Sequence, residues 1–205
     1  MRRQYPRKYL TVGEAGRLIE TAPRYGAAGL LALTLLYSGA RVSEALAISP
    51  ADLDDADLQD AALLLPTLKQ RPRPGQLPPI RTVPIPPSLA RALRKRADNQ
   101  GAGPLFNVSR STAWRWVGAV MSAAGVPGPL CHPHALRHTM ATLDLDADIP
   151  IRLIQSILGH SRLETTELYA AAQRRTIRRH LSRMWASVPE PEYARPPPKK
   201  KNMRT

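Results

Sequence analysis

The chain has 205 residues, a formal net charge of +14 and a pI near 10.8. This length predicts one domain with room for a substantial core, and the excess positive charge favours a polyanionic partner, above all nucleic acid. The single cysteine, Cys131, excludes an internal disulfide framework. No signal peptide is expected, and the longest uncharged run, Tyr25 to Ala40, is too short to span a bilayer. We therefore expect a cytoplasmic, nucleoid-associated protein with no membrane contact.

Arginine supplies most of the positive charge, since only six of the 30 basic residues are lysine. A guanidinium can grip a phosphate with two parallel hydrogen bonds, so this bias fits a DNA partner. A GC-rich genome, which favours arginine codons, would explain much of the lysine shortage but not the excess charge.

The first half of the chain predicts helices and then a short change of character. After a basic lead-in (1–10), the capping-box pattern Thr11-x-x-Glu14 opens a helix that ends near Thr21. An apolar helix follows from about Tyr25 to Ser38, and Gly39 ends it. Another helix is predicted to begin over Arg41 to Ala47. Two strands, Ala61 to Leu68 and Arg81 to Ile85, are predicted on either side of a long basic hairpin tip.

The second half is again helical. Further helices are predicted over 87–100, 109–124 and 173–185, and a proline- and lysine-rich disordered tail from 189 to 205. The predicted fold class is α+β, mostly α-helical with one small antiparallel sheet, and the predicted domain covers residues 11–188.

Cys131 to Ala170 is the stretch around which the chemistry is organised. His134 and Arg137 lie three residues apart and would share a helix face. Gly159 stands where a second helix would end, and the capping-box pattern of Ser161 and Glu164 would open a third. Three short helices could thus bring together the groups needed to hold and attack a phosphate, namely His134, Arg137, His160 and Tyr169.

These residues resemble the tyrosine recombinases, also called the phage integrase family. The matching elements are SGARVSEALAI (38–48), Lys69 between two strands, HPHALRH (132–138), LGHS (158–161) and Tyr169, and their order and spacing agree over roughly Leu10 to Ala172. Members usually carry a separate N-terminal helical domain that clamps the opposite face of DNA. Only about ten residues precede the catalytic domain here, so the chain is similar to the minimal recombinases that invert fimbrial promoters.

The resemblance implies that Tyr169 attacks a DNA phosphate, forms a 3′-phosphotyrosyl bond and releases a 5′-hydroxyl. A phenol, with a reference pKa near 10, needs activation for this at neutral pH. By the same resemblance His134 assists its deprotonation, His160 donates a hydrogen bond to the phosphate and Lys69 protonates the leaving oxygen.

The resemblance also implies that Arg41 and Arg137 neutralise the non-bridging phosphate oxygens, with Glu44 orienting Arg41. Guanidinium groups then supply the charge that divalent ions supply in other phosphoryl transfers, so we expect no metal and no cofactor. His138 lies one turn beyond His134, but HALRH lacks the glutamate of a zincin helix.

The remaining arginines are predicted to contact backbone phosphates, which gives affinity and salt dependence without sequence readout. The partners expected from the resemblance are double-stranded DNA, a homotetramer on DNA formed from a monomer in solution, and accessory DNA-bending proteins. Helix 173–185 would pack either on its own domain or on a neighbouring subunit. The predicted DNA-binding residues are Arg71, Arg73, Arg110, Arg115, Arg174 and Arg175.

Our interpretation is a site-specific DNA recombinase of a mobile element, with integration, excision, inversion and resolution all open. Two alternatives stay open: a type IB topoisomerase-like relaxation activity, and a DNA-binding module without cleavage activity. In isolation, Arg41 and Glu44 would also fit an ordinary surface pair, and Tyr169 an ordinary packed tyrosine.

Overall fold

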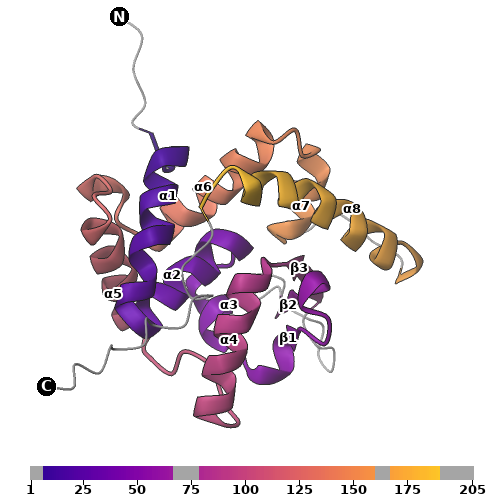
Figure 1. Ribbon diagram of the computed structural model, residues 1–205, viewed down its shortest axis with the longest axis horizontal. Coiled ribbons are helices and arrows are strands. Elements are labelled where there is room, and N and C mark those ends of the chain that lie inside the picture. The colour runs from indigo at the N-terminus through magenta and orange to yellow at the C-terminus, as the bar shows by residue number, and fades with distance from the viewer. Residues whose placement is uncertain (1–6, 67–78, 160–166, 190–205) are drawn as a thin grey trace, which may run out of the picture.

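The computed structural model describes residues 7–66, 79–159 and 167–189, and of residues 167–175 it describes the backbone only. Helices make up most of this part of the chain and accompany a small antiparallel sheet of strand order β1-β2-β3 (Figure 1). The predicted fold class, α+β and mostly helical with one small antiparallel sheet, is confirmed. Among the described residues, no helix is long and apolar enough to cross a membrane.

The first two helices lie where the sequence predicted them, because their signals are local. α1 (Val12–Thr21) starts after Thr11, whose hydroxyl accepts from the Glu14 N–H while the Glu14 carboxylate accepts from the Thr11 N–H. A 3-10 turn, η1 (Ala22–Tyr25), leads into α2 (Gly26–Ser38). All residues of α2 from 29 to 38 are buried. The helix contacts η1, α4, α5 and α6. It is therefore the central helix of the domain.

Gly39 ends α2 in the left-handed conformation, with φ 59° and ψ 16°, and its N–H donates to the Leu35 carbonyl. A Cβ built on Gly39 would lie 2.9 Å from Leu158 Cδ2 and 2.9 Å from Met140 Sδ. Glycine is therefore needed here both for its backbone conformation and for the close approach of two other segments. The turn directs the chain into α3 (Val42–Ala47).

The sheet contains one strand that the sequence did not predict. β2 (Ala62–Pro66) and β3 (Ile80–Pro84) pair antiparallel with Leu63 opposite Val83, close to the predicted bounds. β1 (Leu53–Asp54) adds to the other edge of β2. A two-residue strand is too short to show an alternating pattern, so the aspartate-rich segment gave no signal for it.

The predicted helices of the second half are present within a few residues of their expected ends. The turn between α6 and α7 contains Asp148, which has a positive φ of 57°. The helices are α4 (Pro87–Gln100), α5 (Arg110–Ala123), α6 (Pro133–Asp146) and α7 (Ile151–Ile157).

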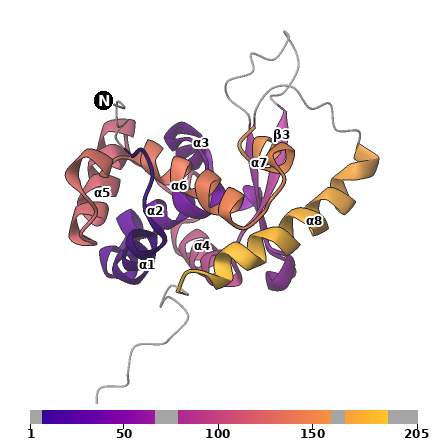
Figure 2. The same cartoon turned by 90° about the horizontal axis from the view of Figure 1, so that it is seen from above.

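The last helix is longer than predicted. α8 (Glu167–Ala186) is continuous, so the backbone of Tyr169 belongs to the same helix as the predicted 173–185 segment (Figure 2). The capping box predicted at residues 161 and 164 lies outside the described residues. Leu181 is fully buried in the domain core, and Arg178 donates to Asp60 at 2.7 Å and to the Ala61 carbonyl. In this structure, α8 therefore packs on its own domain.

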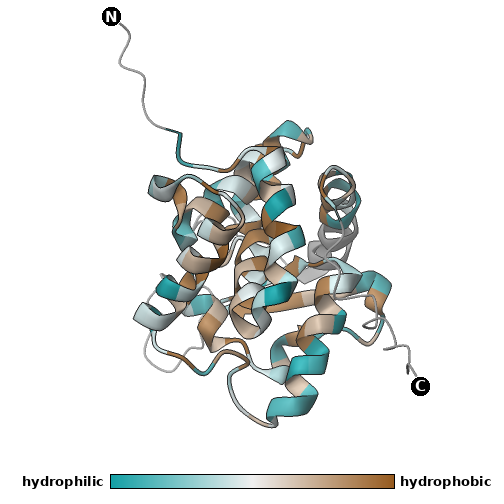
Figure 3. Cartoon of the chain, turned by 60° about the vertical axis from the view of Figure 1, so that its left-hand side comes forward, coloured by the Kyte–Doolittle hydropathy of each residue, from teal (hydrophilic) through white to brown (hydrophobic). Residues whose placement is uncertain are grey.

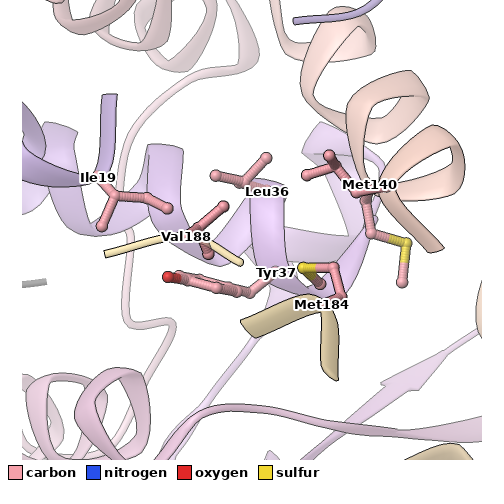
Figure 4. A pocket seen from close by; sticks show the side chains of 7 residues that line it. Ile19, Leu36, Tyr37, Met140, Met184 and Val188 are labelled. Carbon is pink, nitrogen blue, oxygen red and sulfur yellow. The ribbon is translucent and has the colours of Figure 1, made fainter. Parts of the chain in front are cut away.

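The hydrophobic residues gather where the helices face one another, and hydrophilic residues lie on the outward faces (Figure 3). The end of α8 and the residues after it complete this core: Met184 of α8 and Val188 line a small apolar pocket together with residues of α1, α2 and α6 (Figure 4). The other labelled residues of the pocket are Ile19, Leu36, Tyr37 and Met140.

We predict that Gly39→Ala lowers the free energy of unfolding by about 2–4 kcal/mol, because the left-handed conformation and the two 2.9 Å contacts both oppose a methyl group. Gly13→Ala is the matched control, since a Cβ there meets no atom within 4 Å. It should be neutral or stabilising by up to about 1 kcal/mol. Urea unfolding of both variants measures the difference, and equal stabilities would contradict the prediction.

Candidate active site

Arg41 stands at the N-terminus of α3, held by a glutamate one turn on. The Glu44 carboxylate accepts from the Arg41 N–H at 2.9 Å and from Arg41 Nη1 at 2.8 Å. The Glu44 side chain is fully buried, whereas that of Arg41 is 20% exposed. One carboxylate thus fixes both the backbone and the guanidinium of Arg41, and leaves the guanidinium reachable from solvent. The contact between Arg41 and Glu44 expected from the sequence is present.

A second arginine, Arg81 of β3, binds the same carboxylate from the other side. Its Nη2 donates to Glu44 Oε2 at 2.6 Å, and its Nε donates to the Ile157 carbonyl at 2.7 Å. From the sequence, Arg81 was expected only as the first residue of a strand. The signal that would have found it is alternation: residues 81, 83 and 85 are all buried, so Arg81 takes a position facing the core.

Burial is the largest influence on Glu44 and pushes its pKa upward. The hydrogen bond and charge of Arg81, with the bonds from Arg41, outweigh burial and leave the pKa of Glu44 below its usual range. Glu44 is therefore a carboxylate at neutral pH, bridging two guanidiniums.

Arg137 of α6 joins this group from a third direction. Its Nη1 donates to the Gly39 carbonyl, and its Nη2 donates to the Leu158 carbonyl at 2.7 Å. Burial, followed by the positive charge of Arg41, lowers the pKa of Arg137 to about 10; Glu44 opposes this and Arg81 adds to it. Arg137 still carries its proton at neutral pH, under repulsion from like charges.

We call Arg41, Glu44, Arg81 and Arg137 the arginine cluster. Among the described residues, its ion pairs all run to the single carboxylate of Glu44, so three positive charges face one negative charge. A partly buried cluster with this excess of positive charge favours the binding of an anion, and planar guanidinium donors suit the oxygens of a phosphate.

The cluster also holds the end of α7. The last carbonyls of a helix lack partners within the helix, and here those of Ile157 and Leu158 accept from Arg81 and Arg137. Gly159 follows with φ 68°, and a Cβ on it would lie 3.1 Å from Arg81 Nη1. The backbone that leads to residue 160 is thereby fixed next to the cluster.

His134 lies in the first turn of α6, one turn before Arg137, and is exposed. The ring of Trp114 meets it edge-on, with ring centroids 6.4 Å apart, and stacks on His132 at 5.7 Å. His132 Nδ1 accepts from the Ala135 N–H and so caps α6.

Desolvation first, and then nearby positive charge, lower the pKa of His134. The charges are those of His132, His138, Arg137 and Arg110. Its imidazole is therefore neutral at neutral pH, which is the form that can accept a proton.

The structure thus brings together Arg41, Glu44 and Arg137, with His134 on the same helix as Arg137. Arg110 and Arg115 are exposed on α5, on either side of Trp114, and neither belongs to the arginine cluster. Lys69, Arg71, Arg73 and His160 lie outside the described residues. Of Tyr169, Arg174 and Arg175, the structure describes only the backbone within α8. Within the described part of the chain, no three His, Cys, Asp or Glu side chains are grouped so that they could hold a metal ion.

Residues 8–175 match the model of the Phage integrase family. The chain is 31% identical over 194 residues to "Tyrosine recombinase XerD" of Bifidobacterium longum, covering 82% of this chain and 59% of that protein. It is 32% identical over 190 residues to "Tyrosine recombinase XerA" of Pyrococcus furiosus, covering 86% and 61%. To "Resolvase" of Escherichia coli it is 30% identical over 190 residues, covering 79% and 72%.

Solved structures show the same fold. A crystal structure of XerA recombinase superposes with a TM-score of 0.64 at 27% identity, covering 91% of this chain and 65% of that one. The integrase of mycobacterium phage Brujita gives a TM-score of 0.64 at 20% identity, covering 93% and 66%. The chain spans about three-fifths of the length of the XerD and XerA proteins it matches.

We predict that sulfate stabilises the protein through the arginine cluster. Sulfate at ten times its dissociation constant should raise the free energy of unfolding by about 1.4 kcal/mol, or the melting temperature by about 3–5 °C, beyond the effect of sodium chloride at equal ionic strength. Arg137→Ala should lose most of this increment, whereas Arg91→Ala, at an exposed arginine of α4, should keep it. Thermal melts check this, and equal increments in both variants would contradict an anion site at the cluster.

We also predict that Trp114→Ala raises the pKa of His134 toward its ordinary value. Desolvation is the largest cause that lowers this pKa, and the tryptophan ring covers one edge of the imidazole. NMR titration of the His134 ring protons measures the change. His138, with which Trp114 makes no ring contact, is the internal reference, and an unmoved His134 would contradict the prediction.

Proposed function

The chain belongs to the phage integrase family, and from this premise we propose that it is a site-specific DNA recombinase. It would cleave and rejoin DNA strands through a 3′-phosphotyrosyl intermediate. The observation that carries the proposal is the arginine cluster, in which one buried carboxylate binds Arg41 and Arg81 while Arg137 lies close by, so that an excess of positive charge remains.

The cluster suits the charge that develops in phosphoryl transfer. A phosphodiester carries one negative charge, and attack by an oxygen nucleophile places further charge on its non-bridging oxygens. Arg41 and Arg137 come from separate elements, and both are fixed by hydrogen bonds before any ligand arrives. Donors held in place in this way stabilise developing charge without reorganising at the moment of reaction.

In the proposed reaction the Tyr169 phenol oxygen attacks phosphorus, and the bond from phosphorus to the 5′ oxygen breaks. The phenol proton passes to His134, whose lowered pKa leaves it neutral and able to accept it. The leaving 5′ oxygen takes a proton from Lys69, and His160 donates a hydrogen bond to the phosphate. A 5′-hydroxyl that attacks the phosphotyrosine reverses these steps and rejoins the strand, so no energy-rich cofactor and no metal is required.

DNA would lie across the exposed part of α5 that carries Arg110, Trp114 and Arg115, since the Trp114 ring contacts His134 and the charge of Arg110 acts on it. Arginines at positions 71, 73, 174 and 175 would add phosphate contacts. Binding of this type weakens steeply with salt, because each neutralised phosphate releases counterions.

Exchange of both strands at two sites needs four nucleophiles, so we propose a homotetramer on DNA that assembles from monomers. Accessory DNA-bending proteins would assist, and the protein would reside with the nucleoid.

The proposal is tested with Tyr169→Phe, which removes only the nucleophilic oxygen. The wild-type chain, mixed with nicked duplexes taken from its genomic neighbourhood, should form a covalent protein–DNA adduct that survives detergent. Tyr169→Phe should form none and still bind the same duplex. Tyr25→Phe is the matched control, because it makes the same change at a half-exposed tyrosine of η1, and it should cleave normally.

Other outcomes separate the alternatives. Adducts that persist in Tyr169→Phe would reassign the nucleophile. Relaxation of any supercoiled plasmid, irrespective of its sequence, would indicate a topoisomerase, and binding without any adduct would indicate a DNA-binding module.

A further inference from the structure

Arg81 is a buried charge at a position where an apolar residue would suffice for folding. It stands in β3 opposite Leu65 of β2, and only 8% of its side chain is exposed. Val83 of the same strand and Ile85 just after it are both buried in the core. Moving a charge out of water is costly, and replacing a buried ion pair by well-packed apolar residues is often neutral or stabilising. Stability alone therefore does not account for an arginine here.

The bonds of Arg81 run to two functional segments that are distant in sequence. Its Nη2 binds Glu44 Oε2, while the other oxygen of that carboxylate, Oε1, binds Arg41 Nη1. Its Nε binds the carbonyl of Ile157 in the last turn of α7. A single guanidinium thus connects the support of Arg41 with the helix end that leads to residue 160.

Arg81 lies so close to the end of α7 that a side chain at position 159 would require the guanidinium to shift. A Cβ on Gly159 would meet Arg81 Nη1 at 3.1 Å and its Cδ and Cζ at 3.3 Å. Nη1 itself is buried without a hydrogen-bond partner in the described part of the chain. An unsatisfied buried donor costs stability, so the position of this guanidinium is again not explained by stability.

We propose that Arg81 is a positioning residue for DNA cleavage. It holds the Glu44 carboxylate against Arg41 and fixes the carboxyl end of α7, so that both sides of the phosphate site keep one geometry. This role rests on the proposed function, and in it Arg81 acts through Glu44 and the end of α7 rather than on the nucleophile or the phosphate.

The electrostatics of Glu44 give this role a measurable signature. The charged groups around Glu44 are Arg41 at its own helix end, Arg81 from β3 and Arg137 from α6. Burial raises the pKa of Glu44 and Arg81 is the strongest opposing influence. Removing Arg81 must therefore raise this pKa. At pH values below the raised pKa, Glu44 is protonated and Arg41 loses its anionic partner.

The test uses the full chain and measures single-turnover adduct formation on a nicked duplex, at saturating protein, from pH 5.5 to 8.5. Arg81→Met should slow cleavage by about 10–100-fold at pH 7, the scale expected when reacting groups are displaced by about 1 Å. The defect should deepen toward acid pH, while DNA affinity changes little. Arg81→Lys should recover part of the rate, because an ammonium reaches Glu44 but does not reproduce the guanidinium fork.

Two further variants separate positioning from folding. Arg94→Met is the matched control, because it removes another ion pair between residues distant in sequence. Arg94 Nε donates to Asp55 Oδ2 at 2.7 Å, and the variant should cleave DNA at the wild-type rate. Arg81→Met combined with Glu44→Gln leaves no unpaired buried carboxylate, so it should stay folded even if Arg81→Met does not. It should remain slow and lose the added acid-side dependence.

A folded Arg81→Met protein that cleaves at the wild-type rate with the wild-type pH profile would overturn the inference. If the wild type itself forms no adduct, the proposed function fails. The role of Arg81 in the arginine cluster is then tested by the rise in melting temperature that sulfate causes. Arg81→Met should lose most of the sulfate-induced rise in melting temperature, with Arg81→Lys keeping part of it. An unchanged rise in Arg81→Met would overturn the positioning role without reference to cleavage.

Discussion

The site depends on one buried carboxylate held between two guanidiniums. Glu44 has no exposed side-chain surface, and its two oxygens bind Arg41 and Arg81. A buried charge is tolerated only when it is paired and hydrogen-bonded, and loss of one partner leaves an uncompensated charge inside the protein. The fold therefore cannot form well around Glu44 unless both arginines are near their observed positions. Because the Arg41 side chain is 20% exposed, the requirement of the core also sets the position of a side chain that, in the proposed reaction, would contact the phosphate.

The same constraint extends to the end of α7. Carbonyls that end a helix need partners from elsewhere, and in α7 the carbonyls of Ile157 and Leu158 accept from Arg81 and Arg137. Arg137 also donates to the carbonyl of Gly39, the residue whose left-handed turn leads into Arg41. Four segments that are distant in sequence are thus joined at one place by hydrogen bonds from side chains to backbone carbonyls. They are the turn at Gly39, strand β3, helix α6 and the end of α7. Such bonds set distances more strictly than apolar packing, which is non-directional.

The parts of this arrangement that were predictable from sequence are those with local causes. The capping box at Thr11 and the glycine stop at 39 need only neighbouring residues, and Arg41 and Glu44 are three positions apart. The motifs that resemble the family placed His134 and Arg137. Arg81 was missed because its partners lie 37 and 76 residues away in sequence, and a lone arginine in a strand gives no sign of them. β1 was missed because two residues carry no periodicity, and the continuity of α8 because Tyr169 and the arginine-rich segment looked like separate units.

The excess charge of the cluster bears on how binding and catalysis are related. Without a ligand the guanidiniums repel one another, and with burial this repulsion lowers the pKa of Arg137 to about 10. An anion relieves the repulsion, and the relief grows with the charge on the anion. A transition state with more charge on its oxygens than the ground-state phosphodiester therefore gains more from the cluster than the substrate does. Only interactions that strengthen in this way accelerate a reaction. The repulsion that burdens the unliganded protein is, on this argument, the one that favours the transition state. Neutralising Arg137, which makes no ion pair with Glu44, is therefore expected to relieve this repulsion while it weakens the proposed reaction.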